Sequence, residues 1–163
     1  MLCAVLLLLG VLTHAQTNIS GVINSYWEVT GIDKCNNNVT LPVTPIGLAA
    51  GDHVILIQMR GVDAEADNSP AYGSIINLSK SGNYEMFTVQ SVVFNVVTFN
   101  EVVGRLYQLA GRVQLVRVPE YSDAKVVGEV TGQPWNGITG GVIAMIVNGT
   151  LTLNENIDAK TIG

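Results

Sequence analysis

Short runs of β-forming residues, separated by turn residues, recur along this chain, and they constrain its fold more than any other feature. The clearest runs cover residues 53–59, 84–93, 96–99 and 113–118. Gly, Asp, Asn and Pro gather between them, as they do between the strands of β-proteins. No stretch keeps the apolar spacing of a helix for more than about two turns. The pattern therefore predicts an all-β fold, a small β-sandwich or barrel.

Two of these runs allow more detailed predictions. Residues 53–59 are almost continuously apolar, which predicts a strand buried on both faces. Residues 84–93 alternate, with Phe87 on one predicted face and Met86 on the other. Asn95 separates that run from 96–99, so a hairpin is predicted there.

The last thirty or so residues contain two β-runs, 142–147 and 150–154, on either side of Asn148-Gly149. One interpretation is a hairpin closed by a type I′ turn. The other is a turn of a parallel β-helix, with Asn148-Gly149 at a corner. Successive turns of such a solenoid bury each other's apolar faces. In this second interpretation three residues point inward: Leu151, Leu153 and Ile157. A further run begins at Ile157, and we expect the chain to be the truncated front of a longer protein.

The first fifteen residues have the pattern of a secretory signal peptide. An apolar run over residues 4–12 precedes small residues at 13–15, which predicts cleavage before Gln16. The run is shorter than the roughly 20 apolar residues that a membrane-spanning helix needs. No later run is long enough either, so we expect no transmembrane segment in the mature chain. The expected location is secreted or at the cell surface.

Composition narrows the classes of partner and of site. The formal net charge is −5, and only 13% of residues are charged, which argues against nucleic acid and anionic membranes. Loss of the signal peptide leaves Cys35 and His53 as the only cysteine and histidine. No intramolecular disulfide is then possible, which fits a bacterial exterior. A zinc site needs about three or four ligands, and no Gly-x-Ser-x-Gly turn is present. No catalytic residue is predicted, and His53 is expected to be structural.

An acidic segment carries the one candidate metal site. Asp63, Glu65 and Asp67 alternate along it, and Asn68 follows. Oxygen ligands at every second position suit Ca²⁺, which binds six to eight oxygens. The Gly and Glu of an EF-hand loop are missing. A solvated acidic loop without a metal is therefore the alternative, and no other cofactor is expected.

Two further groups of residues could serve carbohydrate chemistry. The first consists of carboxylates that could form an acid pair: Glu85, Glu120, Asp123 and Asp158. The second consists of aromatic residues that could stack on sugars: Trp27, Trp135, Tyr72, Tyr107 and Tyr121. Nothing in the spacing selects a pair or a platform. Surface acids and core packing are the alternative interpretations.

Several stretches resemble the N-terminal region of large secreted or surface proteins of Bacteroidetes-like bacteria, which are adhesin-like and of the gliding-motility-associated type. The stretches are Gly51-Asp52 with 53–59, Tyr72-Gly73, 82–85, 114–121, Trp135-Asn136-Gly137, Gly140-Gly141-Val142, 151–153 and Ile157-Asp158. The resemblance implies a surface-exposed or released protein with an N-terminal β-domain followed by repetitive β-structure. It implies no catalytic residues.

Together these observations predict three parts: a signal peptide (1–15), an N-terminal β-domain (16–132) and the start of a β-helix or a terminal hairpin (133–163). Gly132 and Pro134 mark the second boundary. The predicted function is that of a non-catalytic exported surface module, the N-terminal part of a larger adhesin-like or cell-envelope protein. Its partner would be a surface polysaccharide or another cell-surface protein. The alternative is a carbohydrate-binding module, or the head of a β-helical polysaccharide-active enzyme whose catalytic part lies beyond residue 163.

Overall fold

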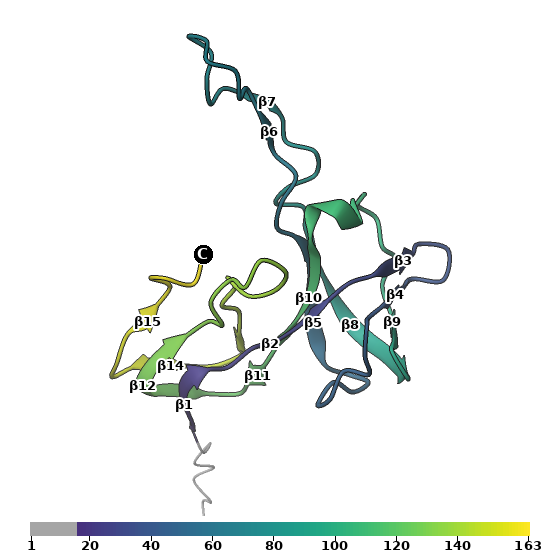
Figure 1. Ribbon diagram of the computed structural model, residues 1–163. Coiled ribbons are helices and arrows are strands. Elements are labelled where there is room, and N and C mark those ends of the chain that lie inside the picture. Colours follow the sequence, from purple (N-terminus) through teal and green to yellow (C-terminus); the bar gives the residue numbers. More distant parts are fainter. Residues whose placement is uncertain (1–15) are drawn as a thin grey trace, which may run out of the picture.

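The computed structural model describes residues 16–163, and the predicted signal peptide lies outside this range. The described chain consists of β-strands and one short 3-10 helix, η1 (Leu109–Gly111). The all-β prediction is confirmed. None of the described residues forms a helix long and apolar enough to span a bilayer. Figure 1 shows two sheet-forming regions and a thin arm that projects away from them.

The larger region is one antiparallel sheet, whose neighbouring strands all run in opposite directions. In spatial order its strands are β2 (Ser25–Glu28), β10 (Val113–Val118), β5 (His53–Gln58), β8 (Tyr84–Val93), β9 (Val96–Phe99), β4 (Asn38–Thr40) and β3 (Gly31–Asp33).

The two ends of this sheet are joined, because β2 and β3 are almost continuous in the chain. At the bend between them, the Val29 N–H donates to the Val113 carbonyl on one side. The next residue, Thr30, donates to the Thr40 carbonyl on the other side. The sheet therefore closes on itself. We call the closed unit, β2–β5 with β8–β10, the barrel.

Alternation along the strands fills the barrel. In β8 and β5 every second residue points inward, and these include Phe87, Val54 and Leu56, which are buried. Phe87 stacks on Phe99 of β9, with ring centroids 4.4 Å apart. The hairpin predicted around Asn95 is present. The expectation that the 53–59 run is buried on both faces holds for the inner face, whereas the outer-face residues of β5 are half-buried.

The projecting arm joins β5 to β8. It contains β6 (Asp63–Ala64) and β7 (Ile75–Asn77), an antiparallel pair with an irregular register. Figure 1 shows that this pair stands clear of the barrel. Its apolar residues Ile75 and Ile76 are exposed, so the arm has no core of its own.

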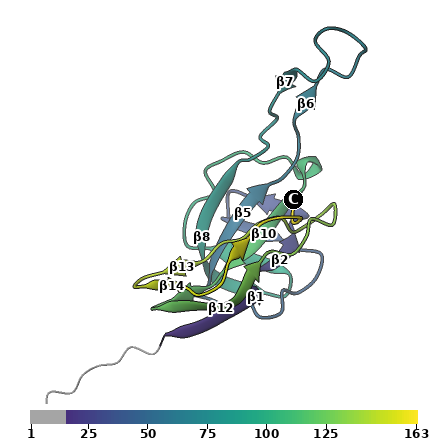
Figure 2. The same ribbon diagram turned by 90° about the vertical axis from the view of Figure 1, so that its left-hand side faces the viewer.

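The smaller region is a parallel stack. β12 (Ala124–Thr131) pairs in parallel with β1 (Thr17–Val22) on one side, and with β14 (Leu151–Leu153) and β15 (Ile157–Asp158) on the other. We call each successive layer of the stack a level: β1 lies in the first, β12 in the second, and β14 with β15 in the last. A second parallel pair joins β11 (Glu120–Tyr121), which comes just before β12, to β13 (Ile146–Val147), which comes just before β14. Figure 2 shows β1, β12 and β14 running alongside each other.

This pairing decides between the two interpretations of the tail. β13 and β14 flank Asn148-Gly149, yet each pairs with an earlier strand and not with the other. The hairpin interpretation is therefore wrong and the β-helix interpretation is confirmed. One turn takes 27 residues, from Ala124 to its partner Leu151 (151 − 124).

The barrel is inserted into the stack. Thr17 of β1 pairs with Ala124 of β12, 107 residues later (124 − 17), and every barrel strand lies between them. The predicted boundary between residues 132 and 133 falls just after β12. The parallel stack takes strands from both sides of this position.

Candidate functional site

The last level of the parallel stack presents an apolar edge. Residues paired across parallel strands lie in one column on the same face of the sheet. In one column Ile19 and Val126 are buried, and Val126 is 0% exposed, whereas their successor Leu153 is 59% exposed. In the next column Val130 is 0% exposed and its successor Ile157 is 40% exposed.

These exposed side chains occupy the positions that form the core one level earlier. Ala124, Val126 and Val130 make up the buried cluster of the stack together with Ile19. Leu151, Leu153 and Ile157 continue the same three columns. We call the surface formed by β14 and β15 with these three residues the open edge. As predicted, the three face the inner side.

The corner that leads into the open edge is fixed by stacking on the previous level. The N–H groups of Asn148 and Gly149 donate to the carbonyls of Tyr121 and Ser122. The Thr150 N–H donates to the Asp123 carboxylate at 2.6 Å. A Cβ added at Gly149 would lie 2.5 Å from the Asp123 carboxylate and 2.7 Å from the Ser122 carbonyl. This close approach explains why glycine stands there.

The predicted calcium ligands lie on the arm, away from this edge. Asp63 begins β6 and accepts a long hydrogen bond, 3.4 Å, from the Ser79 hydroxyl. Glu65 accepts from the backbone N–H of Asp67. Within residues 16–163 no three acidic, histidine or cysteine side chains gather closely enough to hold a metal ion. The calcium site stays a prediction, without a ligand set in this arrangement.

His53 and Cys35 are in separate parts of the barrel. Cys35 is exposed in the turn between β3 and β4, whereas His53 begins β5. The His53 Nε2 atom lies 3.3 Å from a carboxylate oxygen of Glu120. Glu120 also accepts a hydrogen bond from the Asn148 side chain at 2.7 Å. His53 thus links the barrel to the stack, in keeping with its predicted structural role.

The four candidate carboxylates each serve a local structural contact. Glu85 accepts hydrogen bonds from the N–H groups of Gly104 and Arg105. Glu120 and Asp123 bind the corner, as described above, and Asp158 binds the N–H of Lys160 at 2.7 Å. Glu120 and Asp123 both bind the 148–150 corner, and no pocket is present among the described residues.

The candidate aromatic residues are dispersed. Trp27 and Tyr107 pack against the barrel core, and Tyr121 packs against the stack core. Burial raises the pKa of Tyr107, and its hydroxyl donates to Glu85 at 3.0 Å. Tyr72 is exposed on the arm. Trp135 is half-buried in the segment after β12, and its backbone N–H donates to the Ile162 carbonyl at 2.8 Å.

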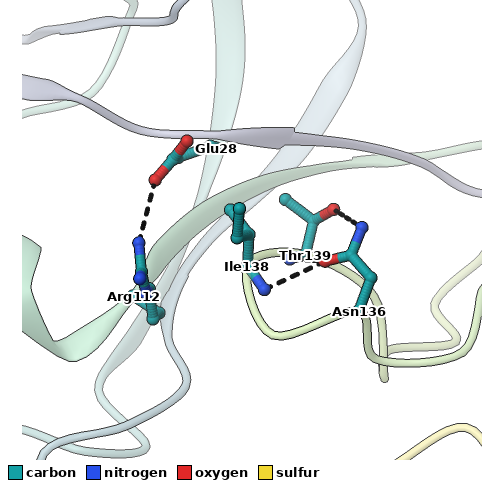
Figure 3. A network of polar contacts seen from close by, with 5 residues as sticks. All are labelled: Glu28, Arg112, Asn136, Ile138 and Thr139. Atoms are coloured by element: carbon teal, nitrogen blue, oxygen red, sulfur yellow. Dashed lines mark hydrogen bonds and ion pairs between the residues drawn. The ribbon is translucent and has the colours of Figure 1, made fainter.

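The segment between β12 and β13 forms a tight polar turn. The Asn136 side-chain oxygen accepts hydrogen bonds from the N–H groups of Ile138 and Thr139, both at 2.9 Å. Figure 3 shows this turn together with the ion pair between Glu28 of β2 and Arg112, whose closest atoms are 3.3 Å apart. An Asx turn of this kind follows from the Asn-Gly sequence.

Three buried amide side chains were missed by sequence reasoning. Gln58 and Gln114 are fully buried in the barrel strands, and Asn24 is buried between β1 and β2. A signal was present, because each glutamine interrupts an apolar run. A polar side chain at such a position needs a hydrogen-bond partner. Local sequence does not tell where that partner lies.

No family model and no curated protein matches this chain. Three solved structures of phage tailspikes are similar to parts of it. The tailspike gp61 of Pseudomonas phage phi297 is 15% identical with a TM-score of 0.39, and the match covers 71% of this chain and 22% of that chain. The tailspike Gp54 of Acinetobacter baumannii bacteriophage AP22, solved with a capsular saccharide, is 13% identical with a TM-score of 0.42, and the match covers 83% of this chain and 22% of that chain. The tailspike gp49 of Pseudomonas phage LKA1 is 19% identical with a TM-score of 0.36, and the match covers 86% of this chain and 23% of that chain. The chain thus spans less than a quarter of each tailspike. At these TM-scores the similarity is partial and assigns neither family nor function.

Proposed function

We propose that this chain is the N-terminal part of an exported, non-catalytic surface protein, in which the barrel heads a parallel β-helix. The observation that carries the proposal is the open edge. Its side chains continue columns that are buried one level earlier, but they are exposed themselves. The surface is therefore shaped to receive another parallel turn.

The energetics of the open edge support this role. Burial of a whole Leu or Ile side chain stabilises a protein by about 1.5–3 kcal/mol. Three such residues are left partly exposed at the edge, together with the backbone groups of β14 and β15 that have no strand beyond them in the described chain. An exposed strand edge of this kind pairs readily with a further strand. A further parallel turn with apolar residues in the three columns would cover the exposed side chains and would pair with the free backbone groups.

Hydrogen exchange tests the proposal. The protein recovered from its own cells or medium is compared with the 163-residue chain produced alone. We expect amide exchange in residues 151–158 to be more than about tenfold slower in the native protein. Amides of β5 serve as the control and should exchange equally in both samples. Equal rates in 151–158 would contradict the proposal.

The same sample tests export and the alternative role. N-terminal sequencing should begin at Gln16 if the signal peptide is cleaved as predicted. A surface polysaccharide as ligand is the second hypothesis, and Tyr72 is the candidate aromatic residue that is most clearly exposed. Saturable binding of a purified surface polysaccharide by the 163-residue chain, weakened by substitution of the exposed Tyr72, would favour that hypothesis over the structural role.

A further inference from the structure

Three polar side chains of the barrel region bind the backbone of the segment that links β12 to β13. They are Asn24, in the connection from β1 to β2, Tyr26 on β2 and Gln114 on β10. Asn24 and Gln114 are buried, and Tyr26 is half-buried. Burial raises the pKa of the Tyr26 phenol, although its hydrogen bond with Gln133 acts in the opposite direction. The phenol thus stays a hydrogen-bond donor at ordinary pH.

Two of these side chains pair with the backbone as a neighbouring strand would. The Gln114 amide donates to the Gly140 carbonyl at 2.8 Å and accepts from the Gly140 N–H at 2.9 Å. The Asn24 amide donates to the Ala144 carbonyl at 2.6 Å and accepts from the Ala144 N–H at 3.1 Å. Asn24 also donates to the Arg117 carbonyl at the end of β10.

Tyr26 binds the residue midway between these two. Its hydroxyl donates to the Val142 carbonyl and accepts from the Gln133 N–H at 3.3 Å. The bound residues are therefore Gly140, Val142 and Ala144. The segment is irregular at this point, because Gly140 and Gly141 both have positive φ and β13 begins only at Ile146. The barrel binds alternate residues of this segment through side chains alone.

This arrangement accepts the segment in one register. A slip by one residue would bring Gly141, Ile143 and Met145 to the three side chains in place of the residues that they bind. A slip by two would move Gly140 from its site. Gly140 has φ of +111°, and a Cβ there would lie 2.6 Å from the Pro134 carbonyl. Any other residue in its place would meet both the clash and an unfavourable backbone conformation.

We propose that Asn24, Tyr26 and Gln114 form a clamp that sets the register in which the turn after β12 lies on the stack. The inference rests on the proposed function, because the clamp would let the inserted barrel position the turn from which the β-helix continues. The three are positioning residues and act only through the backbone of residues 133–144.

Cross-linking reads the register directly. Lys125 of β12 pairs with Thr152 of β14, and neighbouring strands bring Cα atoms within disulfide range. In a background with Cys3→Ser and Cys35→Ser, the pair Lys125→Cys with Thr152→Cys reports the native register. The pair Lys125→Cys with Thr150→Cys reports a slip by two residues. We expect the unclamped chain, Asn24→Leu with Gln114→Leu, to lose at least half of the native cross-link and to gain the slipped one.

Gln58→Leu is the matched control. Gln58 is a fully buried glutamine on β5, next to β10, but it binds the Arg60 and Ser79 carbonyls and the Gln108 N–H, all outside the stack. We expect this variant to keep the native cross-link. If the double variant does not fold, Tyr26→Phe, which removes one hydroxyl, should still raise amide exchange in residues 133–144 severalfold while β5 is unchanged.

The clamp is contradicted if the double variant keeps the native cross-link in full, or if Gln58→Leu lowers it as much. It is also contradicted if Tyr26→Phe leaves exchange in 133–144 unchanged. These readouts use only the 163-residue chain. The clamp can therefore be contradicted while hydrogen exchange shows that the open edge is covered in the native protein. Equally, the clamp can be supported while the open edge proves to be uncovered.

Discussion

The barrel and the parallel stack solve the problem of sheet edges in opposite ways. The barrel joins its first and last strands through the bend at Val29 and Thr30, so its core is surrounded on all sides. The stack builds its core by adding levels, and the residues of its last level stay exposed. A closed sheet is complete by itself, whereas a stack is completed only by a neighbour. An open stack explains why apolar residues in one column, such as Val126 and Leu153, differ so much in their exposed fraction.

The largest expected effect separates a complete core from an incomplete one. Leu56→Ala in the barrel removes a fully buried side chain and should lower the free energy of unfolding by about 3 kcal/mol, because a cavity remains. Leu153→Ala makes the same chemical change at the open edge and should cost less than about 0.5 kcal/mol. Urea denaturation of the 163-residue chain measures both. Similar losses in the free energy of unfolding at the two sites would contradict the difference between the barrel and the stack.

An intermediate effect is expected at the corner of the stack. Gly149→Ala places a Cβ against Asp123 and the Ser122 carbonyl, and overpacking of this kind costs about 1–3 kcal/mol. We expect amide exchange in residues 150–158 to accelerate while the barrel is unaffected. Gly163→Ala, which meets no neighbouring atom, is the control. An equal acceleration in β5 would show that the two regions unfold as one.

A smaller effect should come from the ion pair between Asp52 and Arg117, whose nearest atoms are 2.9 Å apart. Burial alone would raise the pKa of Asp52, but hydrogen bonds from Arg117 and from the Ala49 N–H outweigh it, so the pKa lies below 3.8. The unfolded chain therefore takes up the proton more readily. The stabilisation is present above pH about 4 and is lost as the pH falls through the folded pKa.

Asp52→Asn tests this expectation. The variant should be less stable than the native chain by about 1 kcal/mol at pH 6, and the difference should shrink below pH about 4. Thermal or urea unfolding across this range measures it. Glu129→Gln removes an exposed carboxylate of β12 and should change stability by less than about 0.5 kcal/mol at any pH. A constant Asp52→Asn difference down to pH 2 would contradict the assignment.

Local sequence predicted the antiparallel part well. The strands at 84–93, 96–99 and 113–118, and the hairpin around Asn95, follow from alternation and turn residues. These contacts are close in the chain, so local patterns encode them. The inward columns of the open edge were also predicted, because the tail repeats apolar residues at alternate positions.

Sequence reasoning could not predict the insertion of the barrel. Nothing in the sequence of β1 indicates its partner, because β12 lies 107 residues later. The clamp residues were missed for a related reason: Gln114 and Asn24 look like polar interruptions until the distant segment that they bind is known. Contacts of this kind depend on tertiary structure, which no local pattern records.

The insertion also affects the order in which the parts of the chain can fold during synthesis. β1 is synthesised before its partner β12, and about a hundred residues separate the two strands. Closing a loop of that length with a flexible chain costs about 2 kcal/mol more than closing one of about ten residues. If the barrel folds first, the loop is reduced to two short connections, one from β1 to β2 and one from β10 to β12. The first level can then form late and at little entropic cost, after the barrel has brought its two ends together.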